Sequence, residues 1–168
     1  QEVVEYFGQA NLNGIHANFN MTTNALLLEK YIDFLVEHRF HLLISLDGNE
    51  KNNSYRVFEN GKSAFSEIVR NVEMVQARFP EYFRESVNFN VVLHDRNSIS
   101  EVSDFFKKRF DRVPSFSSIS AMGIREDAKE EFKRIYKIVA EDMKSCSESS
   151  ELERRTLFRL PDMRGLLN

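Results

Sequence analysis

The stretch HLLISLDGNEKNNSYRVFENGKSAF, residues 41–65, decides the interpretation of the fold. Its first residues belong to the apolar run 40–47, which is typical of a strand covered on both faces. Ser45 and Asp47 stand where this run ends, and the polar loop that follows carries Arg56. One strand therefore delivers a hydroxyl, a carboxylate and an arginine to the same end of the fold.

The same order of strand and helix recurs along the chain. Apolar residues alternate or run together in some segments and repeat every three or four positions in others, which are the patterns of strands and helices. The predicted strands are 15–23, 40–47, 87–93 and 115–123, and the predicted helices are 25–39, 63–79 and 98–110. Strands that alternate with helices at this spacing pair in parallel, so the sequence predicts an α/β fold.

The pattern changes after residue 124. Residues 126–144 predict a longer, charged amphipathic helix, and the polar segment 145–151 predicts a linker before an apolar tail. We therefore expect two regions, 1–124 with the strand–helix units and 125–168 with the helix, linker and tail.

Composition excludes several classes of function. The chain has 168 residues, and its 23 basic and 26 acidic side chains give a net charge of −3, so we expect no nucleic-acid partner. No apolar run approaches the roughly 20 residues of a membrane span, so we expect no membrane partner. The single cysteine, Cys146, excludes an internal disulfide and any site held by several cysteines of this chain. It also fits a reducing compartment, so we expect a cytoplasmic protein.

Polar side chains gather at the predicted carboxyl ends of the strands, where parallel α/β folds bind their ligands. Hydroxyl, amide and carboxylate groups there can hydrogen-bond a ribose or an amino-acid head group, and Arg56 can pair with a carboxylate. The residues at these ends are Thr22, Thr23, Asn24, Ser45, Asp47, Val92, Leu93, His94, Ala121 and Met122.

Each of these residues also has a structural interpretation. Thr23-Asn24 makes a good N-cap, Asp47 before a glycine is a common turn residue, and Arg56 in a polar loop is most often a solvated charge. His94 is the histidine best placed to meet a ligand. The sequence has no glycine-rich nucleotide loop after a strand, no Walker loop, no G-x-S-x-G and no H-E-x-x-H.

The chain contains five short motifs in this order: TNALL (23–27), SLDG (45–48), RV (56–57), GKSAF (61–65) and RNVEMV (70–75). Their order resembles the core of radical S-adenosylmethionine (radical SAM) enzymes. The branch that it resembles matures peptides and proteins, carries a SPASM or twitch domain, and includes anaerobic sulfatase-maturing enzymes and thioether-forming peptide maturases. The resemblance covers about residues 1–122.

The resemblance implies a parallel-stranded fragment of a partial (β/α)6 TIM-like barrel, with roughly four of its six βα units. It assigns Ser45 to the ribose or amino-acid part of SAM, Arg56 to the SAM carboxylate, and Asp47 to the space near cofactor and substrate. Thr23-Asn24 lines the rim, and Val92 packs on adenine. The cofactor-binding residues that it implies are therefore Ser45, Asp47, Arg56, Thr23, Asn24 and Val92.

The sequence departs from the family in the parts that hold iron. It has neither the C-x-x-x-C-x-x-C motif nor the G-G-E motif, and Ala25 stands where the family has a glycine. The first residues, QEVVEYF, already resemble the middle of an amphipathic helix, so we expect a piece of a longer protein. The piece alone should be inactive and hold no metal or tightly bound cofactor. The parent would use a [4Fe–4S] cluster and SAM to make a radical that abstracts hydrogen from a bound peptide or protein.

Two further expectations complete the prediction. A barrel cut in this way leaves an unpaired strand edge, so the isolated chain should form a homodimer or exchange strands. The alternative function is a non-catalytic α/β binding or interaction module whose strand-end polar groups only form caps and turns. A doubly wound nucleotide-binding domain is disfavoured because the glycine-rich phosphate loop is missing.

Overall fold

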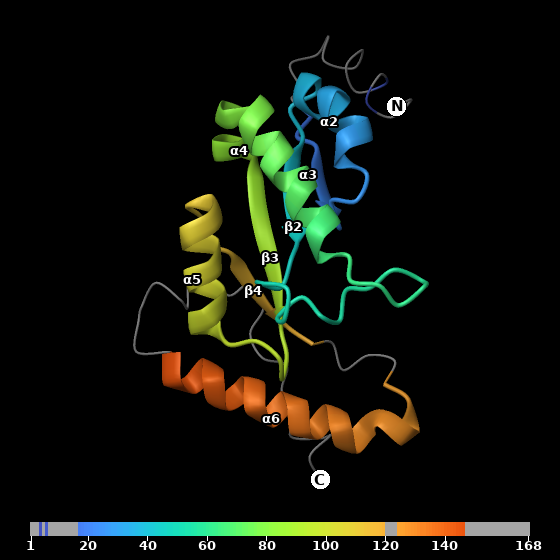
Figure 1. Cartoon of the computed structure of the whole chain (residues 1–168), viewed down its shortest axis with the longest axis vertical. Coiled ribbons are helices and arrows are strands. Elements are labelled where there is room, and N and C mark those ends of the chain that lie inside the picture. Colours follow the sequence, from blue (N-terminus) through green and yellow to red (C-terminus); the bar gives the residue numbers. More distant parts are fainter. Residues whose placement is uncertain (1–3, 5, 7–16, 120–123, 147–168) are drawn as a thin grey trace. The chain divides into compact units, whose positions relative to one another are not determined.

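The computed structural model of the chain describes residues 4, 6, 17–119 and 124–146 (Figure 1). Its four strands form one parallel sheet in the order β1-β2-β3-β4, which confirms the predicted α/β fold. The strands are β1 (Asn20–Thr23), β2 (His41–Ser45), β3 (Val87–Leu93) and β4 (Ser115–Ser118). The helices are α2 (Leu28–Glu37), α3 (Phe65–Arg78), α4 (Pro80–Ser86), α5 (Ile99–Phe110), the 3-10 turn η2 (Glu126–Ala128) and α6 (Lys129–Cys146).

Helix α4 is the element that the sequence analysis missed. The sequence predicted one helix over 63–79 and nothing more before the next strand, and α3 does end at Arg78. Pro80 then begins a new helix, which it can do because the first helical residue needs no backbone N–H donor. The ends of the predicted strands 15–23 and 115–123 fall partly outside the described residues, as do the predicted linker and tail.

The chain divides into two compact units, Gln1–Ile44 with Glu67–Asn88 and Ser45–Ser66 with Phe89–Asn168. In the first unit, β1 pairs with β2 from Asn20 opposite His41 to Thr23 opposite Ile44. Helix α2 buries Leu28, Ile32 and Leu35, which recur at the three- and four-residue spacing of one helix face. The predicted division at residue 124 stays a prediction.

The turn between β1 and α2 contains an alanine with a left-handed backbone conformation. Ala25 is fully buried and has φ of +64°, a conformation that costs an L-residue about 1–2 kcal/mol. Asn71 of α3 stabilises this turn, because its Nδ2 donates to the carbonyls of Ala25 at 2.9 Å and Leu26 at 3.2 Å. A buried amide from a distant helix thus offsets the strain of the alanine.

In the second unit, α5 packs on β3 through aromatic rings. The ring of Phe89 lies 4.7 Å from that of Phe106 and 5.1 Å from that of Phe110. Ser98 caps this helix, because its Oγ accepts the backbone N–H of Glu101 at 3.3 Å.

Helix α6 is tied to the start of α5. The backbone N–H of Ile99 donates to Asp142 Oδ2 at 2.9 Å, which places a carboxylate at the positive end of α5. Among the described helices, none is long and apolar enough to cross a membrane. Strand β1 stands at one end of the sheet order, and dimerisation through that edge stays a prediction.

Candidate cofactor-binding site

Buried asparagines shape the loop that follows β2. The backbone N–H of Asp47 donates to Asn53 Oδ1 at 3.1 Å, and Asn52 and Asn49 exchange side-chain and backbone hydrogen bonds at 3.0 and 3.2 Å. Asn52 and Asn53 are both fully buried. Gly48 has φ of +124°, and a Cβ there would meet Asn52 Oδ1 at 2.8 Å, so the turn requires glycine. This loop has a polar sequence, but the hydrogen bonds of its buried asparagines hold its conformation.

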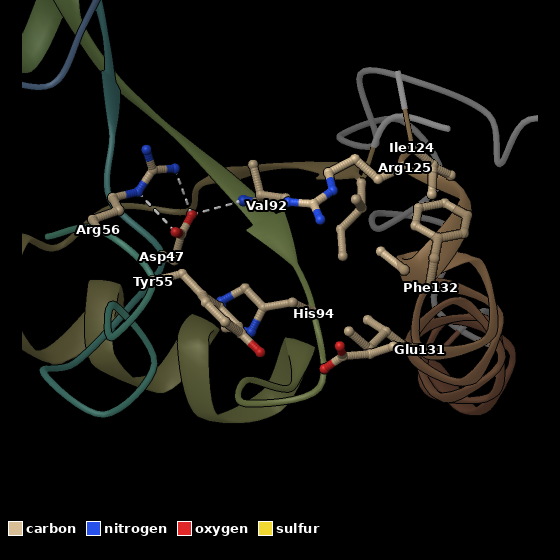
Figure 2. Close-up of a pocket in the computed structure, with 12 residues that line it drawn as sticks. Asp47, Tyr55, Arg56, Val92, His94, Ile124, Arg125, Glu131 and Phe132 are labelled. Atoms are coloured by element: carbon tan, nitrogen blue, oxygen red, sulfur yellow. Dashed lines mark hydrogen bonds and ion pairs between the residues drawn. The ribbon is translucent and has the colours of Figure 1, made fainter. Parts of the chain in front are cut away.

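This loop presents Asp47 and Arg56 to each other. Arg56 donates from Nε to Asp47 Oδ2 at 2.7 Å and from Nη2 to Oδ1 at 2.8 Å, and the backbone N–H of Val92 donates to the same Oδ1 at 2.9 Å (Figure 2). Asp47 is 3% exposed. The interpretation of Arg56 as a solvated charge is therefore wrong, because it makes a bidentate ion pair that is largely desolvated.

The arginine keeps one donor group for another ligand. Its side chain is 25% exposed, and its Nη1 has no hydrogen-bond partner among the described residues. Asp47 thus holds the guanidinium in place through two of its nitrogens and leaves the third available.

A cavity of about 680 Å³ adjoins this pair (Figure 2). Its size is within the range of small-molecule and cofactor sites. Of the predicted site residues, it brings together Asp47, Arg56 and Val92, with His94 beside them. The lining residues, all in the second unit, are Asp47, Tyr55, Arg56, Val92, His94, Ile119, Ile124, Arg125, Ala128, Glu131, Phe132 and Ile135.

The other predicted residues are not among those that line the cavity. Ser45 is the last residue of β2 and is half-buried. Thr23 and Asn24 belong to the first unit, where their side chains accept the backbone N–H groups two residues on, at 3.1 and 3.3 Å. They do not cap α2, whose N-cap residue is Leu27, so the N-cap interpretation of this pair is wrong.

Sequence reasoning missed the wall that α6 contributes. Ala128 of η2 and Phe132 and Ile135 of α6 line the cavity at four- and three-residue spacing, which is the apolar face of the predicted helix 126–144. That amphipathic pattern was visible in the sequence, but nothing in it indicated which surface the face would cover.

His94 and Tyr55 form the polar side of the cavity. Burial lowers the pKa of His94, so the ring is neutral near pH 7. Its Nδ1 accepts the backbone N–H of Arg96 at 3.0 Å, and its Nε2 lies 3.2 Å from Asn97 Nδ2. The Tyr55 ring lies edge-on to His94 at 4.9 Å and carries the Arg96 guanidinium 3.9 Å above its centre.

Asp95 links this side of the cavity to α6. It accepts Tyr55 OH at 3.0 Å and Arg134 Nη2 at 3.1 Å. Burial, followed by the hydrogen bond to Asp95, raises the pKa of Tyr55. Burial acts to raise the pKa of Asp95, but the hydrogen bonds from Tyr55, Arg134 and a backbone N–H, together with the charge of Arg134, outweigh it and lower that pKa. Both groups therefore keep fixed protonation states near neutral pH.

The cavity combines apolar walls, a neutral imidazole, a phenol and a partly free arginine. Such a lining suits an organic ligand that has a flat apolar part and an anionic end. Among the described residues, no group of His, Cys, Asp and Glu side chains is arranged to hold a metal ion.

The fold is similar to that of anSMEcpe, an anaerobic sulfatase-maturing enzyme. Compared with the anSMEcpe structure that holds AdoMet and the Kp18Cys peptide, this chain has a TM-score of 0.61 and 19% sequence identity. The match covers 86% of this chain and 42% of the anSMEcpe chain. This chain has the fold of part of that enzyme. With the AdoMet complex the TM-score is 0.58 at 19% identity, covering 84% and 43%, and with the Cp18Cys peptide complex it is 0.57 at 20% identity, covering 84% and 44%.

The structural similarity confirms the fold that the family resemblance implied. The chain spans less than half the length of the anSMEcpe structures that it matches. No family model matches the sequence, and no curated protein does.

Proposed function

We propose that the chain is part of a radical SAM enzyme that modifies a peptide or protein, and that the cavity of the second unit takes the adenosine part of SAM. The observation that carries the proposal is the coincidence of fold and cavity. The chain has the fold of an enzyme whose structures hold AdoMet and peptide, and the cavity is lined by three of the residues that the resemblance assigns to SAM.

The residues then have the following roles. The Val92 side chain packs on adenine, and the Ser45 hydroxyl bonds the ribose or the amino-acid part. Arg56 neutralises the SAM carboxylate through Nη1, while Asp47 holds its guanidinium by the other two nitrogens. Thr23-Asn24 would line the rim of the complete barrel.

The residues present do not fit an iron–sulfur cluster. A cluster of this family needs three cysteine thiolates, and the chain has one cysteine. The cluster ligands would therefore come from outside this sequence, and the chain alone would be inactive. A protein extended through the upstream coding region, reconstituted without oxygen from iron and sulfide, should show the absorbance of a [4Fe–4S] cluster; an extended protein that binds no iron would contradict the proposal.

SAM binding by the chain itself tests the site. We expect saturation-transfer NMR to detect transfer of saturation from the protein to the adenine protons of SAM. The affinity should be weak, because the other half of the barrel is missing. Ser45→Ala should weaken binding about tenfold, because one hydrogen bond to the ligand is lost. Ser103→Ala is the matched control, since Ser103 is also half-buried but lies on α5. No transfer to SAM at millimolar ligand, or equal effects of the two variants, would contradict the assignment.

A non-catalytic binding module is the alternative function. One observation favours it: Asp47 and Arg56 satisfy each other without any ligand, and Asp47 also bonds the backbone of Val92. In that case both side chains only stabilise the loop after β2, and SAM should not bind.

A further inference from the structure

Among the described residues, Glu131 on α6 is the charged residue of the cavity lining that has no ion-pair partner. Asp47 and Arg56 form one ion pair, and Arg125 pairs with Asp127 through Nε at 3.0 Å and Nη2 at 2.6 Å. Glu131 has no hydrogen bond or ion pair to any described residue, although it lines the cavity. The cavity therefore carries one uncompensated negative charge.

The helix itself explains why this carboxylate is free. Glu126 and Glu130 each pair with a lysine three residues on, and Arg134 stands in that position relative to Glu131. Arg134 instead donates to Asp95 at 3.1 Å, in the segment after β3. The ordinary pairs are Glu126–Lys129 at 2.6 Å and Glu130–Lys133 at 3.0 Å.

The free carboxylate faces the cavity. Figure 2 shows it projecting from α6 toward Tyr55 and His94. After burial and Asp95, the charge of Glu131 is among the causes that raise the pKa of Tyr55, as expected for a negative group nearby. Between these polar groups the walls are apolar, with Val92 and Phe132 among them.

We propose that Glu131 determines which base the cavity accepts, by taking a hydrogen bond from the exocyclic amine of adenine. This inference rests on the proposed function, which puts the adenosine part of SAM in the cavity. An ionised carboxylate only accepts hydrogen bonds, so it favours an amine and repels a carbonyl oxygen at the same place. Apolar walls alone distinguish poorly between two rings of the same shape.

Two probes isolate this contact. S-adenosylhomocysteine and S-inosylhomocysteine have the same shape and differ in the group at C6, which is an amine in the first and a carbonyl in the second. Titrated into the full 168-residue chain and followed by amide NMR shifts, the adenosyl compound should bind at least about tenfold more tightly.

Glu131→Gln should abolish this preference, because a carboxamide can accept from the amine or donate to the carbonyl. The matched control is Glu130→Gln, which removes a neighbouring acid that pairs with Lys133 and should keep the preference. Glu131 is exposed, so both variants should keep the fold, which the same spectra report.

The outcomes separate the two proposals. Equal binding of the two probes by the unsubstituted chain, or equal weakening of both probes by Glu131→Gln, would overturn the role of Glu131 while leaving the SAM site standing. If neither probe binds the unsubstituted chain, the proposed function fails, and the role of Glu131 fails with it.

Discussion

Replacing Asp47 by asparagine should destabilise the fold by about 3 kcal/mol. Asp47 is nearly buried and accepts three hydrogen bonds, two from Arg56 and one from the backbone of Val92. Asparagine has almost the same shape, but only one of its two terminal atoms is an acceptor. Its NH2 group would face an N–H donor that bonds a carboxylate oxygen of Asp47. The substitution therefore tests the charge and the acceptor count without opening a cavity.

The magnitude follows from the exposure of the two partners. Removing one member of a buried ion pair costs about 3–5 kcal/mol, because the remaining charge is left without compensation. The Arg56 side chain is 25% exposed and can regain some water, which places Asp47→Asn near 3 kcal/mol, at the lower end. Arg56→Gln strands a carboxylate that is only 4% exposed, so it should cost at least as much.

Urea unfolding followed by far-UV circular dichroism measures both effects. Asp33→Asn is the matched control, since Asp33 pairs with Arg78 at 2.8 Å but the two side chains are 73% and 46% exposed. An exposed pair contributes about 0–1 kcal/mol, so this variant should change little. The double variant of Asp47 and Arg56 should cost clearly less than the sum of the two single costs, because it leaves no unpaired charge.

Two results would refute this reasoning. If Asp47→Asn costs no more than the control Asp33→Asn, the pair is solvated and the loop does not hold it. If the two single costs simply add in the double variant, Asp47 and Arg56 do not interact, and the bidentate geometry is not the one present in solution.

Three further predictions concern the scaffold, each measured by the same urea unfolding. Asn71→Ala should cost about 2–3 kcal/mol by removing two hydrogen bonds to the carbonyls of Ala25 and Leu26 in the turn after β1, and a cost below 1 kcal/mol would contradict that role. Gly48→Ala should cost at least about 2 kcal/mol because its Cβ would meet Asn52, whereas Gly61→Ala, which faces open space at φ +78°, should cost about 1 kcal/mol; equal costs would contradict the close approach. Burial raises the pKa of Tyr82 from 10.0 to about 12, so the folded state holds this proton more tightly than the unfolded state does. Stability should therefore be retained below pH 10 and fall as the pH rises toward 12, and Tyr82→Phe should reduce that fall; a variant with the unchanged profile would exclude the tyrosine as its source.

The sheet was predictable because its strands bear strong local signals. Residues 87–93 alternate buried and less buried positions over their whole length, and prediction and structure agree there at both ends. Helix α4 was not predictable from the same signals, since Pro80 both ends one helix and begins another. A proline alone does not reveal which of these two roles it takes.

The meeting of Asp47, Arg56 and Val92 was predictable because the carboxyl ends of parallel strands bring such groups together. The ion pair between Asp47 and Arg56 was not predictable, because the conformation of the loop between them depends on buried asparagines such as Asn53. Whether an asparagine is buried follows from the tertiary fold and cannot be derived from a polar stretch of sequence. The wall from α6 was missed for the same reason.

The ion pair bears on the proposed SAM contact in a way that the sequence did not suggest. A free arginine would have to be ordered when the ligand carboxylate binds, at a cost of about 0.5–1.5 kcal/mol for a long side chain. Asp47 orders Arg56 beforehand and leaves Nη1 available, so the carboxylate would meet a fixed donor. A lysine could not serve both carboxylates with the same geometry, because its single ammonium group lacks the planar fork. Arg56→Lys should therefore weaken SAM binding even where the positive charge and the fold are retained, which separates a positioned guanidinium from a merely positive site.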